Sequence, residues 1–423
     1  MLESLRNSMR LPGLRNRLLF TALMLAVLRA GAHIPVPGVN LDIVRSLFGQ
    51  GGFLGMIDLF SGGAFKNLAI FALGVTPYIN SSIIVQLLTI VIPRLEEMQK
   101  EGEEGRKKIQ QYTRYGTVVL GLIQAFATAL YLKRTPGAFL HDSWLTMAVI
   151  MITLTAGTSF LMWLGEMITE KGIGNGISLI IFAGIVARGP NTIRTTVDML
   201  RAGSLSIFKV ALIAVIALAV VAMVILITEG VRKIPVEYAK RVVGKRVYGG
   251  QRTHLPIKIN QAGVIPVIFA QSLLFLPQTV AGFLPNTNWF ARFVGLYLTG
   301  NSIWFWVLNA LFIVFFTYFY TAVTFNPTDV ADNMKKNGGF VPGYRPGKPT
   351  ADYLTRVSER LTLVGALFLA ALTILPAALV QLTGAQQASI GGTSLLIVVG
   401  VALETMKQIE AQLVMRHYQG FMR

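Results

Sequence analysis

The sequence predicts an all-α polytopic membrane protein with ten transmembrane helices in two inverted, pseudo-symmetric five-helix halves. Three observations lead to this fold class. Apolar stretches recur along the whole chain, and a helix of about 20 apolar residues crosses a bilayer core of roughly 30 Å. Charged residues make up 14% of the 423 residues, whereas a soluble domain contains about 25%. Two short motifs also recur five apolar stretches apart.

Ten apolar segments are the candidate spans. They are 18–34, 68–92, 117–132, 144–164, 176–187, 210–227, 262–284, 303–325, 361–382 and 390–403. The fifth and tenth are short and need flanking residues to span. Arg29 is the ionisable residue that falls clearly inside a span, near its outer end, where a long side chain can extend to the membrane surface.

The basic residues determine the expected orientation. The chain has 38 Lys and Arg against 20 Asp and Glu, a net charge of +18. Most of the basic residues fall on one side if the N-terminus is inside, as the positive-inside rule requires for cytoplasmic segments. We therefore expect both termini in the cytoplasm, which needs an even number of spans. The positive charge then follows from orientation, and no specific nucleic-acid readout is expected.

Two long segments on the predicted inner side have the character of docking surfaces. Segment 229–260 is basic and β-branched, and it is long enough for a hairpin. Segment 326–360 has a tip rich in glycine and proline, which displays Arg345 between Pro342 and Pro346. Rigid loops often carry binding contacts. The alternative is that both segments are solvated loops whose charge serves only orientation.

An internal repeat divides the chain. GVTPYI at 74–79 matches GVIPVI at 263–268, and GISLII at 176–181 matches GTSLLI at 392–397. Each second copy lies five spans after the first, so the halves are 1–200 and 201–423. Because five is odd, the second half enters the membrane from the opposite side. Inverted repeats with interrupted helices place the working site at their interface, near the middle of the membrane.

The repeat also selects side chains. Ile79 aligns with Ile268 and Ile181 with Ile397, while Ile83 and Ile185 follow four residues after their partners on the same helical faces. If these faces converge, they form an apolar ring, which can close a pore by dewetting. Such a ring also fits around a chemically varied polypeptide. Ordinary packing of isoleucines in a helical bundle is the alternative.

The chain lacks the residues of several other functional classes. It has no cysteine, and its histidines show no ligand spacing, so we expect no metal site. We expect no catalytic residue, no cofactor and no enzymatic activity, and the energy for any transport must come from a partner. A secondary transporter for a small solute is the alternative function, because inverted repeats are common in that class.

The apolar segment 53–66 lies between the first two spans and is too short to cross. It is a candidate re-entrant segment or plug. An interfacial helix is the alternative.

Several motifs together make a specific resemblance. They are FALG at 71–74 with PYI at 77–79, KEGE at 100–103 with QYTRYG at 111–116, GNGIS at 174–178, THLP at 253–256, GVIP at 263–266, FVPGYRPG at 340–347 and GGTSLLI at 391–397. In these motifs, from the first half to the last span, the chain resembles the SecY family, the channel subunits of the bacterial Sec translocase.

The resemblance implies a clamshell of two halves around an hourglass pore. Its constriction would be sealed by Ile79, Ile83, Ile181, Ile185, Ile268 and Ile397, and its plug would include Met56, Ile57, Leu59, Phe60, Ser61, Gly62 and Gly63. A lateral gate would open between helices two and three on one side and seven and eight on the other. Gln86, Gln124 and Gln271 are candidate gate residues.

The resemblance also implies partners. Lys245, Arg246 and Arg345 match positions that engage the SecA motor ATPase or the ribosome. SecE would clamp the two halves, and SecG would join them. Signal sequences and nascent polypeptides would enter the pore, and membrane lipid would receive transmembrane segments. The expected location is the bacterial plasma (inner) membrane.

Overall fold

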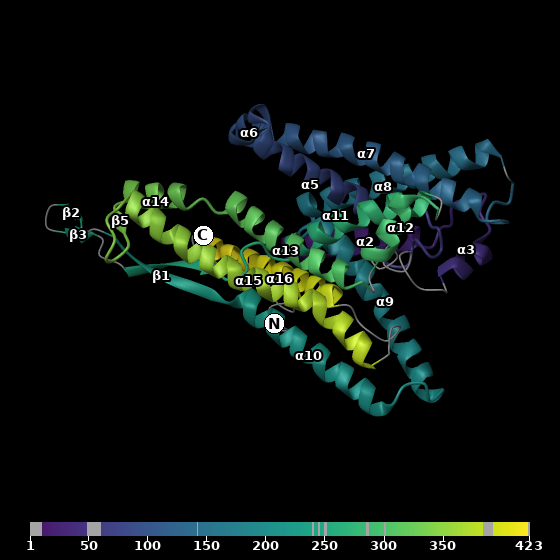
Figure 1. The fold of residues 1–423 in the computed structure, drawn as a ribbon. Helices are drawn as coiled ribbons and strands as arrows, with labels where there is room; N and C mark the ends of the chain where they lie inside the picture. Colours follow the sequence, from purple (N-terminus) through teal and green to yellow (C-terminus); the bar gives the residue numbers. More distant parts are fainter. Residues whose placement is uncertain are drawn as a thin grey trace.

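Ten helices lie at the positions of the ten predicted spans in the computed structural model (Figure 1). The structure describes residues 11–48, 61–141, 143–238, 241–243, 246–248, 252–284, 287–299, 302–383 and 392–421. The first half contains α2 (Pro12–Gly31), α5 (Thr76–Val91), α7 (Glu103–Arg134), α8 (Trp144–Lys171) and α9 (Gly176–Arg201). The second half contains α10 (Ile207–Glu229), α11 (Ile265–Phe283), α13 (Ile303–Thr324), α15 (Lys348–Thr383) and α16 (Gly392–Phe421).

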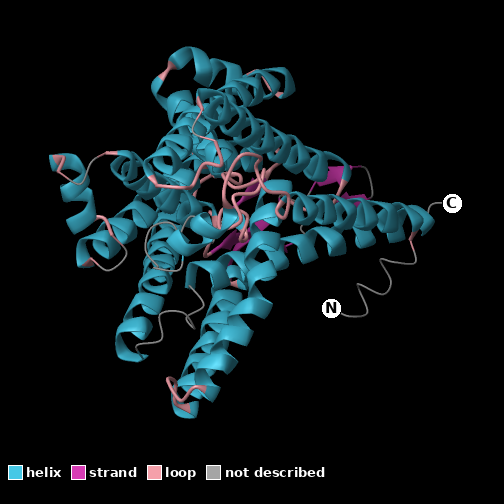
Figure 2. Cartoon of the chain, turned by 90° about the vertical axis from the view of Figure 1, so that its right-hand side faces the viewer, coloured by secondary structure: helices cyan, strands magenta, loops and turns pink. Residues whose placement is uncertain are grey.

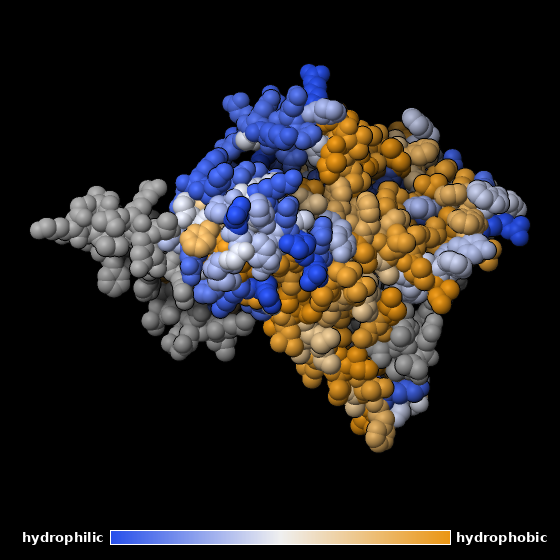
Figure 3. All heavy atoms as spheres, turned by 60° about the vertical axis from the view of Figure 1, so that its left-hand side comes forward, coloured by the Kyte–Doolittle hydropathy of each residue, from blue (hydrophilic) through white to orange (hydrophobic). Residues whose placement is uncertain are grey.

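The surface of the molecule is that of a membrane protein. Among the described residues, six helices are each long and apolar enough to span a bilayer, and the bent pair formed by α5 and α6 (Pro93–Lys100) is a seventh candidate. Figure 3 shows a broad hydrophobic surface and, at one end, a hydrophilic cap. Helix α10 illustrates the apolar side, because Leu218 is 70% exposed there. The hydrophilic cap, which includes α6 and α14 (Pro327–Lys336), is called the polar end below.

The internal repeat is present in the backbone as well as in the sequence. Gly74 and Gly263 have φ angles of +60° and +64°, a conformation that glycine adopts without a steric cost. The next residues, Val75 and Val264, cap α5 and α11, and both helices carry a proline in the first turn. Proline is favoured at that position because its missing N–H would have no partner there. The prediction of two matching halves is confirmed.

The predicted span 68–92 is wrong in its first third. Residues 64–75 form a buried irregular segment, and the helix begins only at Thr76. The positive φ of Gly74 prevents the helix from extending backwards. Segment 64–75 is fixed instead by backbone pairing with the end of the first helix. The N–H of Val36 donates to the carbonyl oxygen of Leu68, and the N–H of Ile70 to that of Ile34, both at 2.9 Å.

The two polar segments 229–260 and 326–360 meet in one small sheet. Strand β1 (Val231–Tyr238) pairs antiparallel with β4 (Arg252–Lys258), which confirms the expected hairpin, and β5 (Gly339–Phe340) pairs with the other edge of β1. At the tip, β2 (Arg241–Val243) pairs with β3 (Arg246–Tyr248). Buried residues of the sheet and of the two helices beside it, α14 and the start of α15, form one apolar core. Ile234, Val236 and Ile257 come from the strands, Val341 follows β5, and Met334 and Leu354 come from the helices. The two segments therefore form a single body at the polar end.

The halves touch along two seams. On one side α11 packs against α5 and α7, and on the other α16 packs against α9. Two short helices, α3 (Leu41–Phe48) and α12 (Trp289–Tyr297), lie at the end away from the strands. Viewed from that side, the helices surround a central group of loops (Figure 2). The largest apolar core lies between the two seams and draws residues from both halves.

Candidate functional site

The six isoleucines predicted from the repeat lie in one apolar cluster. Ile79 and Ile83 come from α5, Ile181 and Ile185 from α9, Ile268 from α11 and Ile397 from α16. Five of them are buried, with exposed fractions between 1% and 6%, and Ile185 is partly buried against the same cluster. The structure therefore brings together, in the central core, side chains that are more than 300 residues apart in the chain.

Glycines let the supporting helices approach closely. A Cβ on Gly176, at the start of α9, would lie 1.9 Å from the carbonyl oxygen of Gly165 on α8. A Cβ on Gly400 of α16 would lie 2.5 Å from a methyl carbon of Val264, the residue that caps α11. A larger residue at 176 would require a helix to move, and one at 400 would require the side chain of Val264 to shift. The start of α9 is thus fixed against α8, and α16 against the start of α11.

The isoleucines are apolar, but unpaired amides lie on one of their helices, α5, and on α13. Asn80, which follows Ile79, is 2% exposed, and its amide oxygen and nitrogen have no hydrogen-bond partner among the described residues. The amide oxygen of Asn309 on α13 is also buried and unpaired. Such groups are costly in an apolar interior. Sequence reasoning missed both residues, although an asparagine within an apolar span is itself a signal.

The three candidate gate residues lie on the predicted helices but do not form a shared network. Gln86 on α5 is half-buried and donates to Ser82 one turn earlier, at 3.2 Å. Gln124 on α7 is also half-buried. The side-chain oxygen of Gln271 on α11 is buried without a hydrogen-bond partner among the described residues. Of the three candidate gate residues, Gln271 is therefore the one with a buried side-chain oxygen that lacks a hydrogen-bond partner among the described residues.

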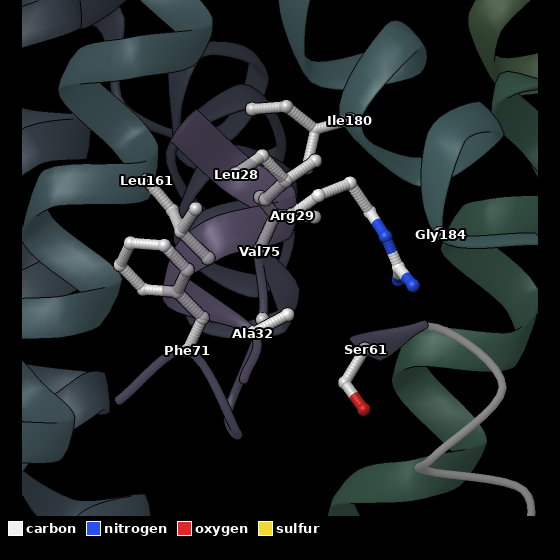
Figure 4. A pocket seen from close by; sticks show the side chains of 10 residues that line it. Leu28, Arg29, Ala32, Ser61, Phe71, Val75, Leu161, Ile180 and Gly184 are labelled. Atoms are coloured by element: carbon white, nitrogen blue, oxygen red, sulfur yellow. The ribbon is translucent and has the colours of Figure 1, made fainter. Parts of the chain in front are cut away.

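The described end of the predicted plug is a tight turn. Met56, Ile57, Leu59 and Phe60 lie outside the described residues. Ser61 accepts a hydrogen bond on Oγ from the N–H of Phe65 at 3.1 Å. Gly62 and Gly63 have φ angles of +65° and +90°. The turn lines a cavity of about 20 Å³ together with Arg29 and Gly184, which is room for about one water molecule (Figure 4).

Arg29 differs from its expected position. Instead of extending to the membrane surface, its Nη1 donates to the carbonyl oxygen of Gly62 at 3.2 Å. Figure 4 shows the side chain reaching from its helix toward Ser61 and Gly184. The expectation failed because this partner lies 33 residues away and becomes a neighbour only through the fold.

Two of the three predicted docking residues, Arg246 and Arg345, lie at the polar end. Lys245 falls outside the described residues, and Arg246 begins β3. Arg345 is exposed, and its carbonyl oxygen accepts a hydrogen bond from Oγ1 of Thr350 at 2.8 Å. Next to it, the ring of Tyr344 stacks on that of Tyr353 at 4.2 Å. The backbone that displays Arg345 is thus fixed while its side chain is free to meet a partner.

The turn between α8 and α9 joins the halves on the side opposite α11. The N–H of Ile173 donates to Oγ1 of Thr21 on α2 at 3.1 Å. The N–H of Gly174 donates to Oε1 of Gln408 on α16 at 2.9 Å. One short turn therefore contacts the first helix and the last, and ties the halves together at this point.

Within the described part of the chain, no group of three or more His, Asp or Glu side chains lies together in a way that would hold an ion. The site described above is therefore built from apolar side chains, glycines, unpaired amides and one arginine.

Comparison with known proteins decides the family. The model of the SecY family matches residues 69–406, and the protein translocase subunit SecY of Halalkalibacterium halodurans is 48% identical over the full length of both chains. The chain belongs to the SecY family. As a SecY-family protein it is a multi-pass membrane protein, and its two five-helix halves are those of the family fold.

Solved structures share this SecY fold at lower identity. One, described as the structure of a protein conducting channel, has a TM-score of 0.66 at 21% identity and covers 95% of this chain and 93% of its own. A second concerns the plug domain of SecY, with a TM-score of 0.65 at 20% identity and coverage of 95% and 92%. Sec61 in a canine ribosome-channel complex has a TM-score of 0.59 at 20% identity and coverage of 95% and 93%.

Proposed function

We propose that this chain is the central pore-forming subunit of a protein-conducting channel in the bacterial plasma membrane. It passes unfolded secretory polypeptides outward and releases transmembrane segments sideways into lipid. The observation that carries the proposal is that six isoleucines from both halves belong to one large apolar core, five of them buried and Ile185 partly buried. Membership of a family whose curated members are named translocase subunits supports it.

The chemistry of the cluster suits a polypeptide better than a small solute. A closed apolar constriction excludes water and ions by dewetting, and its apolar side chains make no polar contact specific to one passing residue. A transporter for an ion or a sugar needs polar groups that converge on the substrate. In the described residues, the largest core draws apolar side chains from both halves, and the buried polar side chains on α5, α11 and α16 are uncharged: Asn80, Ser272 and Ser394 among them. This favours the channel over the alternative of a small-solute transporter.

Lateral release is proposed along the seam where α11 meets α5 and α7. These helices pack directly on one another, while the opposite side is tied by the turn between α8 and α9. Separation of the halves at α11 would expose the isoleucines to lipid on one side. The unpaired side-chain oxygen of Gln271 and the amide of Asn80 would gain water as the seam opens.

The polar end is proposed to face the cytoplasm, together with both termini, and to carry the docking surface. Arg345 is exposed on a fixed backbone, and Arg246 lies in the hairpin tip next to Lys245. We expect these cations to contact the SecA motor or the ribosome. Sec61, which shares the fold, is described in a complex with the ribosome. SecE and SecG are the further subunits expected, and no enzymatic activity of the chain itself is expected.

Reconstitution tests the proposal. The chain, SecE and SecG are placed in lipid vesicles with SecA, ATP and a preprotein that carries a signal sequence. Protease-protected preprotein should accumulate inside, and it should be absent without SecA or without ATP. If all components are active with another SecY-family channel but none of the preprotein is protected with this chain, the proposed function is wrong.

A further inference from the structure

The positive charge of Arg29 is partly buried in the protein, and this position requires an explanation. It lies in the last turn of α2 and is neither fully buried nor exposed. Cations inside a membrane protein are costly and commonly mark functional sites. Extension to the membrane surface would remove that cost. The guanidinium instead turns to the interior and donates to the carbonyl oxygen of Gly62.

The turn that receives this hydrogen bond is also seated on α9. A Cβ on Gly62 would lie 2.6 Å from the Cα of Gly184, so the two backbones are in direct contact. Gly184 lies next to Ile185 on α9. The turn at 61–63 therefore abuts the isoleucine cluster at its edge.

The surroundings strengthen the contact between Arg29 and the turn. The cavity beside it is small and mostly apolar, lined among others by Leu28, Val75 and Ile180. The cavity of about 20 Å³ has room for about one water molecule to compete for the guanidinium, and a hydrogen bond from a charged donor is stronger than a neutral one. Among the described residues that line the cavity, Arg29 is the charged one. Its loss would leave the turn with its backbone contact to Gly184 and its internal hydrogen bond.

We propose that Arg29 is a positioning residue that fastens the turn 61–63 to α2, beside the contact of the turn with α9 at the edge of the isoleucine cluster, and thereby stabilises the closed pore. This rests on the proposed function in one respect, because the pore gives the contact its consequence. The contact between Arg29 and the turn can be tested without transport. Loss of the charge should raise the exposure of the turn on the order of tenfold, the size expected for one hydrogen bond to a charged group.

The absence of cysteine from the chain makes the test direct. Ser61→Cys supplies a single thiol in the turn. The labelling rate of this thiol by a membrane-impermeant maleimide, added from the outer face, is measured in the assembled complex with SecE. The second substitution is Arg29→Gln, Arg29→Met or Arg29→Lys. We expect about tenfold faster labelling with Gln and Met, and an intermediate rate with Lys, which keeps the charge but not the shape of the donor.

Arg45→Gln is the matched control. Arg45 lies in α3, in the connection between α2 and α5 that also contains the turn 61–63. It donates to Oδ1 of Asn67 at 3.4 Å, but this contact is exposed. Its loss should leave the labelling of Cys at 61 unchanged. The proposal would be overturned if Arg29→Gln and Arg29→Met leave the labelling rate at its parent value. The variant complexes must elute and melt as the parent complex does. If Gln and Met variants fail to assemble, the Lys variant decides, and a rate equal to the parent's then counts against a role for the guanidinium.

A conductance measurement separates this proposal from the proposed function. In planar bilayers, Arg29→Gln should increase ion leak while translocation continues. Faster labelling without ion leak would support the contact between Arg29 and the turn but refute its role in closing the pore. If the parent complex translocates nothing, the proposed function fails, and the labelling result still decides whether Arg29 holds the turn.

Discussion

Replacement of an isoleucine in the cluster by asparagine tests the seal most directly. Ile268 and Ile397 come from two different helices of the second half, and they are 6% and 1% exposed. Asparagine is similar in length but carries an amide. In the closed cluster that amide would face apolar side chains, whereas in an open pore it would face water. Ile268→Asn and Ile397→Asn should therefore shift the equilibrium toward the open state.

The size of the shift follows from two contributions. Burial of an isoleucine side chain stabilises by about 1.5–3 kcal/mol, and an amide buried without a partner costs about 1–3 kcal/mol. The lower ends allow for relaxation of the neighbouring side chains and sum to about 2.5 kcal/mol. That corresponds to a change in the ratio of open to closed states on the order of 60-fold. A pore that is rarely open would then conduct measurably.

The assay is ion conductance of the complex in planar bilayers, together with translocation of a preprotein whose signal sequence is defective. Both should increase in the two asparagine variants. Ile397→Val, which stays apolar, should change neither. Val220→Asn is a second control, because Val220 is in the same core, 4% exposed, but lies on α10 outside the six isoleucines. Unchanged conductance and unchanged selectivity in both asparagine variants would refute the assignment of the seal.

Three further substitutions test other parts of the structure. Arg345→Glu should abolish SecA-driven translocation while SecE still copurifies; loss of SecE would show that the residue has a structural role. Gly157→Ala should lower the free energy of unfolding of the complex by about 1–3 kcal/mol, because a Cβ there would lie 1.9 Å from a backbone oxygen. Gly121→Ala is the control and should not lower it, because the nearest atom to its Cβ would be 3.8 Å away. Glu166→Gln removes an ion pair with Arg114 at 2.9 Å and should cost about 1 kcal/mol at low salt and less at high salt; an equal effect at both would exclude an electrostatic cause.

Much of the fold was predictable because a bilayer requires long apolar helices. Helix α8 begins at Trp144, as expected, and α10 and α13 differ from the predicted spans by a few residues. Hydropathy measures the apolar part of a helix, so it could not reveal that α7 and α15 continue well into polar sequence. It also treated 68–92 as one helix, because segment 64–75 is as apolar as a span although its backbone is irregular. The sheet that joins the two polar segments depends on pairing between distant strands, which hydropathy does not report.

The repeat predicted isoleucines that belong to the core shared by both halves. Their role as a ring that seals a pore stays a prediction. The environment of Arg29 was not predictable, because its partner depends on how the turn at Gly62 folds back on α9. The unpaired amides of Asn80 and Asn309 also emerge only from burial. Sequence indicates which residue types are present, whereas satisfaction of their hydrogen bonds is a property of the packed chain.

The backbone pairing of segment 64–75 limits how such a pore can widen. The bonds that join Val36 to Leu68 and Ile34 to Ile70 tie the end of α2 to the segment that leads into α5. An unpaired backbone group in an apolar environment costs several kcal/mol, so pulling α5 away from α2 would be expensive. In the proposed channel, we therefore expect α2 and α5 to move together. We expect the aperture to widen by displacement of α11 and its neighbours, so that one wall stays stationary while the other moves.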